Sequence, residues 1–127
     1  MSVEAVAADF ARIGNLEPVA IEGEVLDLAH LGNYTLGDEA LKREILDLFR
    51  EQIKNSLHRL QEAADTGDES AWQMAAHTLK GSARAVGAFR LGSAAAAGER
   101  YADSCDGRLM ALGTIALVAQ ETYSAVG

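Results

Sequence analysis

The sequence predicts an all-α fold, an up-down antiparallel four-helix bundle with one or two short N-terminal helices. Hydrophobic residues fill 49% of the 127 positions, and much of that fraction is alanine, the best helix former. Aromatic residues make up only 6%, so the strand signature is weak. Pro18 is the only proline, so no residue after it needs to interrupt a helix. Apolar residues recur at helical spacing in segments joined by short turns, which favours antiparallel neighbours.

The N-terminal part of the chain carries two shorter helical patterns. Residues 2–13 have apolar positions at helical spacing, and we expect a short helix packed on the bundle or an arm. Residues 24–34 are expected to form a second short helix with a left-handed cap near Gly32. These patterns divide the chain into an N-terminal helix or arm, residues 1–23, and a bundle domain, residues 24–127.

The first bundle helix is the longest in the prediction. Thr35 or Asp38 is expected to cap its start, and the helix is expected to stop near Gly67. Thr66 and Glu69 have the spacing of a capping box, which predicts the start of the second bundle helix. Apolar positions of the first helix follow helical spacing at Leu41, Ile45, Leu48, Phe49, Ile53, Leu57 and Leu60.

Two further helices complete the predicted bundle. The second helix is expected to extend to Val86 and to end at Gly87. Residues 88–104 are predicted to form the third helix, although their central glycine, serine and alanine residues would also suit a flexible linker. A turn is expected at residues 106–107, before a last helix over residues 108–125. One face of that last helix is expected to carry Leu109, Leu112, Ile115 or Ala116, and Ala119.

Charge and cysteine content narrow the classes of function. Eleven basic and 19 acidic residues give a net charge of −8, which disfavours nucleic-acid binding. Cys105 is the only cysteine, so we expect neither an internal disulfide nor a zinc site built from cysteine pairs. The first residues carry acids and no long apolar run, unlike a signal peptide or a membrane span. We therefore expect a soluble, cytoplasmic protein.

The second bundle helix carries a polar stripe that includes a histidine. Its apolar stripe is expected to carry Trp72, Ala75, Leu79, Ala83 and Val86. The opposite stripe carries Gln73, His77, Lys80, Gly81 and Arg84. His77 is therefore expected to face solvent in mid-helix. Gly81 costs a helix roughly 1 kcal/mol relative to alanine, which suggests that a side chain must be absent there.

This stripe has chemistry that suits a phosphoryl acceptor. A neutral imidazole is a nucleophile near neutral pH and forms a covalent phosphoramidate. If Nε2 of His77 is the acceptor atom, Nδ1 must carry the proton and be held by another group. Lys80 would attract an incoming phosphoryl group. An ordinary surface histidine remains the alternative on this evidence alone.

The sequence around His77 resembles a known signature. H-T-L-K-G-S-A at residues 77–83, followed by V-G-A at residues 86–88, is similar to the signature of the histidine-containing phosphotransfer (HPt) domain. Residues 37–49 resemble the first bundle helix of that family, and the resemblance covers roughly residues 24–126. It implies a four-helix bundle with an exposed phosphoacceptor histidine on the second bundle helix.

The resemblance also implies roles for individual residues. His77 would be the phosphoacceptor, Lys80 would assist electrostatically, and Gly81 would leave the imidazole accessible. Ser82 matches a position that helps fix the helix or contacts the phosphoryl group. Glu99 lies 22 residues beyond the histidine, where family members often carry the side chain that hydrogen-bonds Nδ1.

The resemblance further implies partners. A response-regulator receiver domain would supply the phosphorylated aspartate and Mg²⁺, and a hybrid histidine kinase would stand upstream, so no cofactor is expected on this chain. No nucleotide-binding motif is present, so we expect no kinase activity of its own. A non-phosphorylated helical interaction module and the phosphotransfer fragment of a chemotaxis-type kinase remain alternatives. We expect a monomer that binds no membrane.

Contacts to the partner are expected around His77. The expected contact residues are Gln73, Ala76, Arg84 and Arg90, with Ala83, Leu36 and Ile53 as further candidates. His30 is expected to be packed and His58 to face solvent, and neither is followed by the lysine and glycine found after His77. Because no Glu-x-x-His pair occurs, we expect no metal site.

Overall fold

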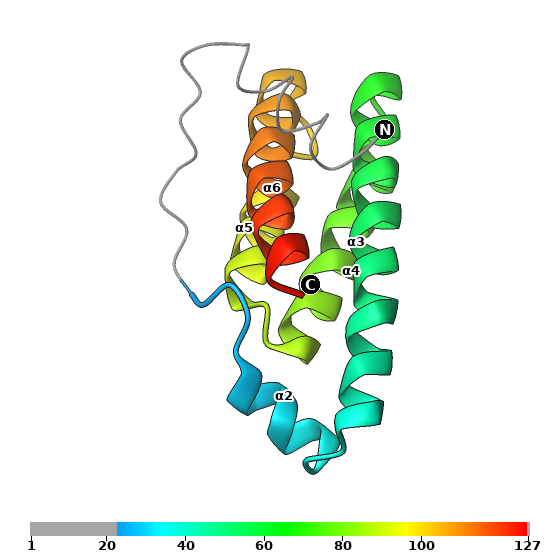
Figure 1. The fold of residues 1–127 in the computed structure, drawn as a ribbon. Coiled ribbons are helices and arrows are strands. Elements are labelled where there is room, and N and C mark those ends of the chain that lie inside the picture. Colours follow the sequence, from blue (N-terminus) through cyan, green and yellow to red (C-terminus); the bar gives the residue numbers. More distant parts are fainter. Residues whose placement is uncertain (1–22, 127) are drawn as a thin grey trace.

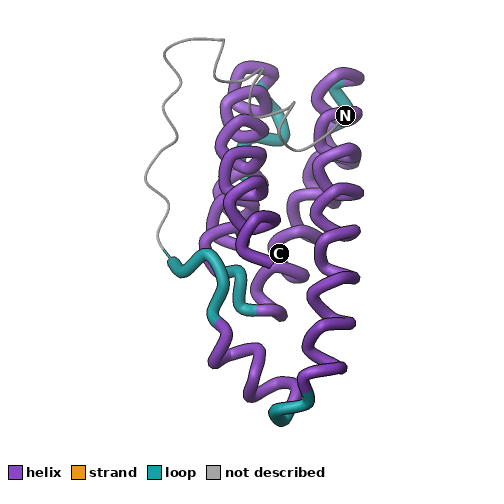
Figure 2. Tube along the Cα trace, in the orientation of Figure 1, coloured by secondary structure: helices purple, strands orange, loops and turns teal. Residues whose placement is uncertain are grey.

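The computed structural model describes residues 23–126, and this part of the chain is helical without strands (Figures 1 and 2). Its helices are α2 (Leu28–Thr35), α3 (Glu39–Thr66), α4 (Glu69–Val86), α5 (Phe89–Glu99) and α6 (Cys105–Val126). The predicted all-α fold is thereby confirmed. The helix or arm expected within residues 1–23 lies almost wholly outside the described residues.

Helices α3 to α6 form an up-down bundle (Figure 1). Each packs against its neighbours in the order α3, α4, α5, α6, and α6 closes the ring against α3. Short α2 lies at one end of the bundle, beside the start of α3, and contacts α3 and α4. The tube in Figure 2 shows how short the connections between the bundle helices are. Such short connections allow only antiparallel neighbours.

The core is built from the apolar stripes of all four bundle helices. Trp72 is fully buried, and its indole Nε1 donates a hydrogen bond to the carbonyl of Gly98 on α5 at 2.9 Å. This bond satisfies the one polar atom of a large aromatic side chain. The whole apolar stripe predicted for α4 is buried: Trp72, Ala75, Leu79, Ala83 and Val86.

Aspartates cap the first three described helices. The carboxylates of Asp27, Asp38 and Asp68 each accept the backbone N–H three residues on, at 3.0 Å. The capping box predicted from Thr66 and Glu69 is therefore wrong. Thr66 still belongs to α3, where its hydroxyl donates to the carbonyl of Glu62 at 2.9 Å.

The start and end of α2 differ from the prediction of residues 24–34. The helix begins at Leu28, directly after the Asp27 cap, and continues through Gly32 to Thr35. Its left-handed cap is Leu36, with φ of 53°, rather than the predicted cap near Gly32. The hydroxyl of Thr35 donates to the carbonyl of Leu31, four residues back, so Asp38 alone caps α3.

The region between α5 and α6 also needs correction. Residues 92–98 are helical, as the bundle prediction requires, but α5 ends at Glu99 rather than at residue 104. The turn predicted at residues 106–107 is instead the first turn of α6, where the Ser104 hydroxyl accepts the N–H of Gly107 at 3.0 Å. A Cβ on Gly107 would lie 2.7 Å from the Tyr101 ring, so this glycine permits close packing and does not mark a turn.

Three leucines of the predicted apolar patterns are exposed, namely Leu41 and Leu48 on α3 and Leu109 on α6.

Helix α6 is both long and apolar. By length and composition alone it could cross a membrane. Half of its most apolar stretch is buried inside the bundle. Its apolar length packs against α3 and α5, as in the core helix of a helical bundle.

Candidate functional site

His77 lies in the middle of α4 and points away from the core. Its side chain is 71% exposed, while Ala76 and Leu79 on the same turn are fully buried. The buried stripe of α4 fixes the rotation of the helix, and this rotation turns His77 towards solvent. The exposure expected from helical spacing is therefore what the structure shows.

Glu99 reaches His77 from the neighbouring helix. Its carboxylate Oε1 lies 3.2 Å from Nδ1 of His77. Glu99 is the last residue of α5, and its side chain is 22% exposed. The small residues of α5 bring that helix close to α4, so a glutamate side chain spans the gap. The structure thus brings together the two residues that the sequence paired.

Lys80 binds the same carboxylate oxygen. Its ammonium Nζ lies 2.8 Å from Oε1 of Glu99. Partial burial alone would raise the pKa of Glu99. The hydrogen bond and charge of Lys80, followed by those of His77, outweigh this effect and hold the pKa below its ordinary value. Glu99 is therefore ionised at neutral pH.

The ionised carboxylate determines which imidazole nitrogen carries the proton. A carboxylate without a proton can only accept hydrogen bonds, so Nδ1 of His77 must be the donor. In a neutral ring, Nε2 then keeps its lone pair. The exposed side chain leaves that outer nitrogen open to an electrophile.

The other residues of the signature surround this pair. A Cβ on Gly81 would have no atom within 4 Å, so the space one turn beyond His77 is open. Ser82 is half-buried on α4 and takes no part in the hydrogen bonds that link His77, Glu99 and Lys80.

Some of the expected partner contacts are ruled out by burial. Ala76, Ala83 and Ile53 are fully buried, so their side chains form the core rather than a docking surface. They were expected to contact the partner as small or apolar residues around the histidine, but they lie on the inward side of their helices. Arg90 pairs with Glu121 on α6 at 3.2 Å.

The remaining expected contact residues are at the surface. Gln73 and Arg84 are exposed on the stripe of His77, and Leu36 is 93% exposed at the end of α2. Gln73 also lines a hollow of about 380 Å³ between α4 and α5, together with Glu99 and Arg100.

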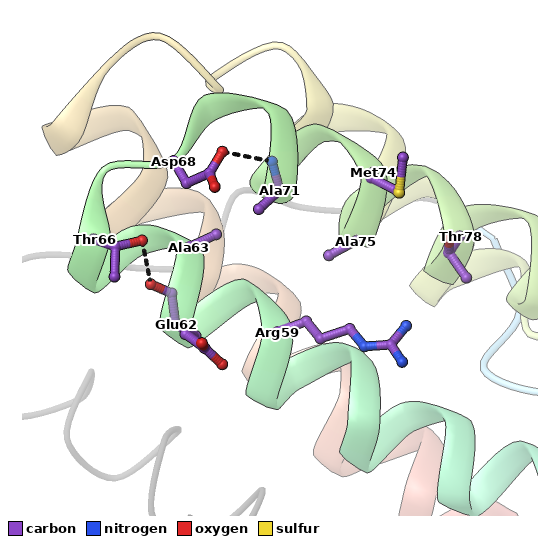
Figure 3. A pocket seen from close by; sticks show the side chains of 9 residues that line it. All are labelled: Arg59, Glu62, Ala63, Thr66, Asp68, Ala71, Met74, Ala75 and Thr78. Carbon is purple, nitrogen blue, oxygen red and sulfur yellow. Dashed lines mark hydrogen bonds between the residues drawn. The ribbon is translucent and has the colours of Figure 1, made fainter.

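A second hollow lies on the other side of His77, between α3 and α4 (Figure 3). Its volume is about 380 Å³, and Met74 and Thr78 line it on α4. Arg59 extends from α3 towards Thr78 across this hollow (Figure 3). Arg59, Met74 and Thr78 were not predicted as site residues. Met74 could have been, because it precedes His77 by three residues and helical spacing places it beside the histidine. Met74 is 72% exposed.

The two other histidines are placed as expected. The ring of His30 packs edge-to-face on Phe89, with centroids 5.2 Å apart. His58 is exposed on α3 and lies 3.7 Å from a carboxylate oxygen of Glu62. Within residues 23–126 no group of three metal-ligating side chains occurs.

The described fold and site define a class of protein, a helical bundle that presents one oriented histidine on its surface. Among protein families, the Hpt domain model matches residues 44–126, about two thirds of the chain. The chain therefore belongs to the Hpt domain family, which acts in phosphotransfer in two-component systems together with receiver domains and kinases. Comparisons with curated proteins and with solved structures find no match.

Proposed function

We propose that His77 is the phosphoacceptor, and that it takes a phosphoryl group from a receiver-domain aspartate and passes it to a response regulator. The observation that carries this proposal is the contact between Nδ1 of His77 and Oε1 of Glu99 at 3.2 Å. This contact orients the ring and leaves the nucleophilic Nε2 facing solvent, where a partner domain can dock.

The proposed step is an in-line displacement at phosphorus. The lone pair of Nε2 forms the P–N bond while the P–O bond to the receiver aspartate breaks, and the aspartate carboxylate leaves with the electron pair. The proton stays on Nδ1, so the phosphorylated ring becomes cationic. The negative charge of Glu99 stabilises that cation. In the reverse step a receiver aspartate attacks phosphorus and the P–N bond breaks.

Lys80 adds positive charge beside the transferred group. It lies one turn beyond His77, and its ammonium is held by Glu99. A compact ammonium at this place stabilises the phosphoryl oxygens during transfer. Mg²⁺ would be bound by the receiver domain, where it neutralises charge on the aspartyl phosphate.

The partners follow from this chemistry. Response-regulator receiver domains supply and accept the phosphoryl group, and a hybrid histidine kinase is the proposed origin of the phosphate. We place the reaction in the cytoplasm and attribute it to a monomeric bundle.

The test uses purified receiver domains of the source organism, phosphorylated with radiolabelled acetyl phosphate. We expect label to move to the wild-type protein in an acid-labile form, and His77→Gln to take up none. His58→Gln is the matched control, because it removes another exposed histidine and should transfer normally. Label retained by His77→Gln would refute the proposal, and so would a wild type that accepts label from no receiver.

A further inference from the structure

Arg84 lies on the same stripe of α4 as His77, seven residues further along. Seven residues make nearly two turns, so the two side chains share a face, about 10 Å apart along the helix axis. Side chains in a helix tilt towards its N-terminus, which leans Arg84 back towards His77. Arg84 is exposed, and the space at Gly81 between the two residues is open.

The aliphatic part of the Arg84 side chain packs on the neighbouring helix α5. Gly92 of α5 is buried, and a Cβ placed on it would lie 3.0 Å from Cγ and 3.6 Å from Nε of Arg84. The methylene groups of Arg84 therefore pack on α5 at Gly92, which has no side chain to block them. This packing already restricts the rotamers of Arg84. The side chain therefore loses less conformational entropy when it binds a partner.

The guanidinium itself is not paired within the described residues. Lys80 is bound by Glu99 and Arg90 by Glu121, but no described carboxylate lies within 4.0 Å of Arg84. Within the described residues, the stripe of His77 thus presents one positive charge that is packed on α5 and has no counter-ion. A guanidinium fork matches a carboxylate in a bidentate geometry, which adds orientation to attraction.

We infer that Arg84 is a specificity-determining residue, which pairs with a carboxylate on the surface of the receiver domain docked over His77. This inference rests on the proposed function, because it names the chemistry of the partner surface at the same site. Arg84 would select receivers with an acidic residue at that position and would speed their association.

A purely structural role for Arg84 makes a different prediction. Arg84 is in the last turn of α4, where a positive charge stabilises the helix through its dipole. In that case its removal would lower the stability of the bundle. The rate of transfer from receivers would then fall only in proportion to the fraction of unfolded protein.

The experiment compares two phosphoryl donors. Phosphoramidate, a small molecule, labels His77 without docking, while a phosphorylated receiver domain must dock. For each variant we take the ratio of the receiver rate to the phosphoramidate rate, using the receiver that reacts fastest with the wild type. We expect Arg84→Ala to lower this ratio about fivefold at about 50 mM salt, and Arg84→Glu to lower it further. The effect should shrink at about 500 mM salt, where surface charges are screened.

Two further variants separate position from charge. Arg43→Ala removes the same charge from α3, where Arg43 pairs with Asp47, and should leave the ratio unchanged. Gly92→Ala keeps the charge of Arg84 but places a methyl group against its stem, and should lower the ratio about twofold. In an Arg84→Ala background, Gly92→Ala should have no further effect on the ratio.

Each outcome decides between the proposals. If Arg84→Ala transfers with the wild-type ratio, or if Gly92→Ala acts equally in both backgrounds, the inference about Arg84 is overturned while the role of His77 stands. If phosphoramidate and every receiver fail to label wild-type His77, the proposed function fails and the inference falls with it.

Discussion

At the scale of single residues, one carboxylate oxygen organises the site. Oε1 of Glu99 lies close to both Nδ1 of His77 and Nζ of Lys80, so one anion orients the imidazole and holds the lysine. The pairing of Glu99 with His77 could be predicted from the resemblance. The contact of Lys80 with Glu99 was not predicted, because it depends on how the end of α5 lies against α4. A sequence pattern on one helix does not determine that register.

Loss of Glu99 should slow phosphotransfer without unfolding the bundle. A hydrogen bond to a charged group contributes about 1.5–3 kcal/mol, so we expect Glu99→Ala to lower the transfer rate about tenfold or more. Glu99→Gln keeps an amide oxygen that can accept from Nδ1, and it should lose only part of that rate. Rates with a phosphorylated receiver and far-UV circular dichroism measure both effects. Equal rates for wild type and Glu99→Ala would show that Glu99 does not position His77.

Gly81→Ala should make the protein more stable and less active. The added Cβ meets no atom within 4 Å, so the helix gains about 0.5–1 kcal/mol from alanine propensity. The same methyl group stands in the open space through which a receiver domain approaches His77. Urea unfolding should therefore show a higher midpoint, while transfer from a receiver slows. Unchanged transfer would mean that the partner does not use this space.

At the scale of elements, the sequence predicted the helices better than their ends. Period and composition depend on many residues, so the extents of α3 and α4 agreed closely with the prediction. Ends depend on single competing groups. Asp68 rather than Thr66 caps α4, and Ser104 rather than a turn at residues 106–107 begins α6. Two neighbouring polar residues can each reach a free N–H at a helix start. The path of the whole turn determines which of them does so.

The turn between α4 and α5 depends on a glycine. Gly87 has φ of 87°, and a Cβ there would lie 2.7 Å from the backbone carbonyl of Asp27. The carbonyl of Gly87 also accepts the N–H of Asp27 at 2.8 Å, which joins the turn to the segment before α2. Gly87 therefore has a left-handed backbone conformation and also lies too close to the backbone of Asp27 to carry a side chain.

Gly87→Ala should destabilise the protein by about 2 kcal/mol or more, since a left-handed residue with a Cβ costs 1–2 kcal/mol before the clash is counted. Urea unfolding measures the change. Gly81→Ala is the matched control: the same replacement, six residues earlier and within α4, is expected to act with the opposite sign. A neutral effect of Gly87→Ala would mean that Asp27 can move away at little cost.

At the scale of the whole molecule, the site is made by two helices that the bundle holds side by side. Family resemblance and amphipathic period were sufficient to predict the bundle, the exposure of His77 and the stripe of α4. The expectation that Ala76, Ala83 and Ile53 contact the partner went against that period at Ala83 and Ile53, which lie on the apolar stripes of α4 and α3. At Ala76, a small residue beside the histidine fits surface or core, and only the packing of α3, α4 and α5 decides between them.

The charge state of Glu99 also links the site to the stability of the bundle. Because its pKa is lower in the folded protein, the unfolded chain binds more protons at this residue as the pH falls. The ionised carboxylate thus stabilises the fold above the ordinary glutamate pKa of 4.5, and this contribution is lost as the pH falls through the lowered value. Glu99→Gln cannot titrate and lacks the contribution at every pH.

We therefore expect the wild type to be more stable than Glu99→Gln at pH 5.5 and the difference to shrink towards about pH 3. Trp72, the only tryptophan, is buried between α4 and α5 and reports unfolding by its fluorescence in urea. Asp65→Asn, at an exposed carboxylate on α3, is the control for replacing an acid by its amide. A gap between wild type and Glu99→Gln that stays constant from pH 5.5 to pH 3 would show that the ion pair with Lys80 does not stabilise the fold.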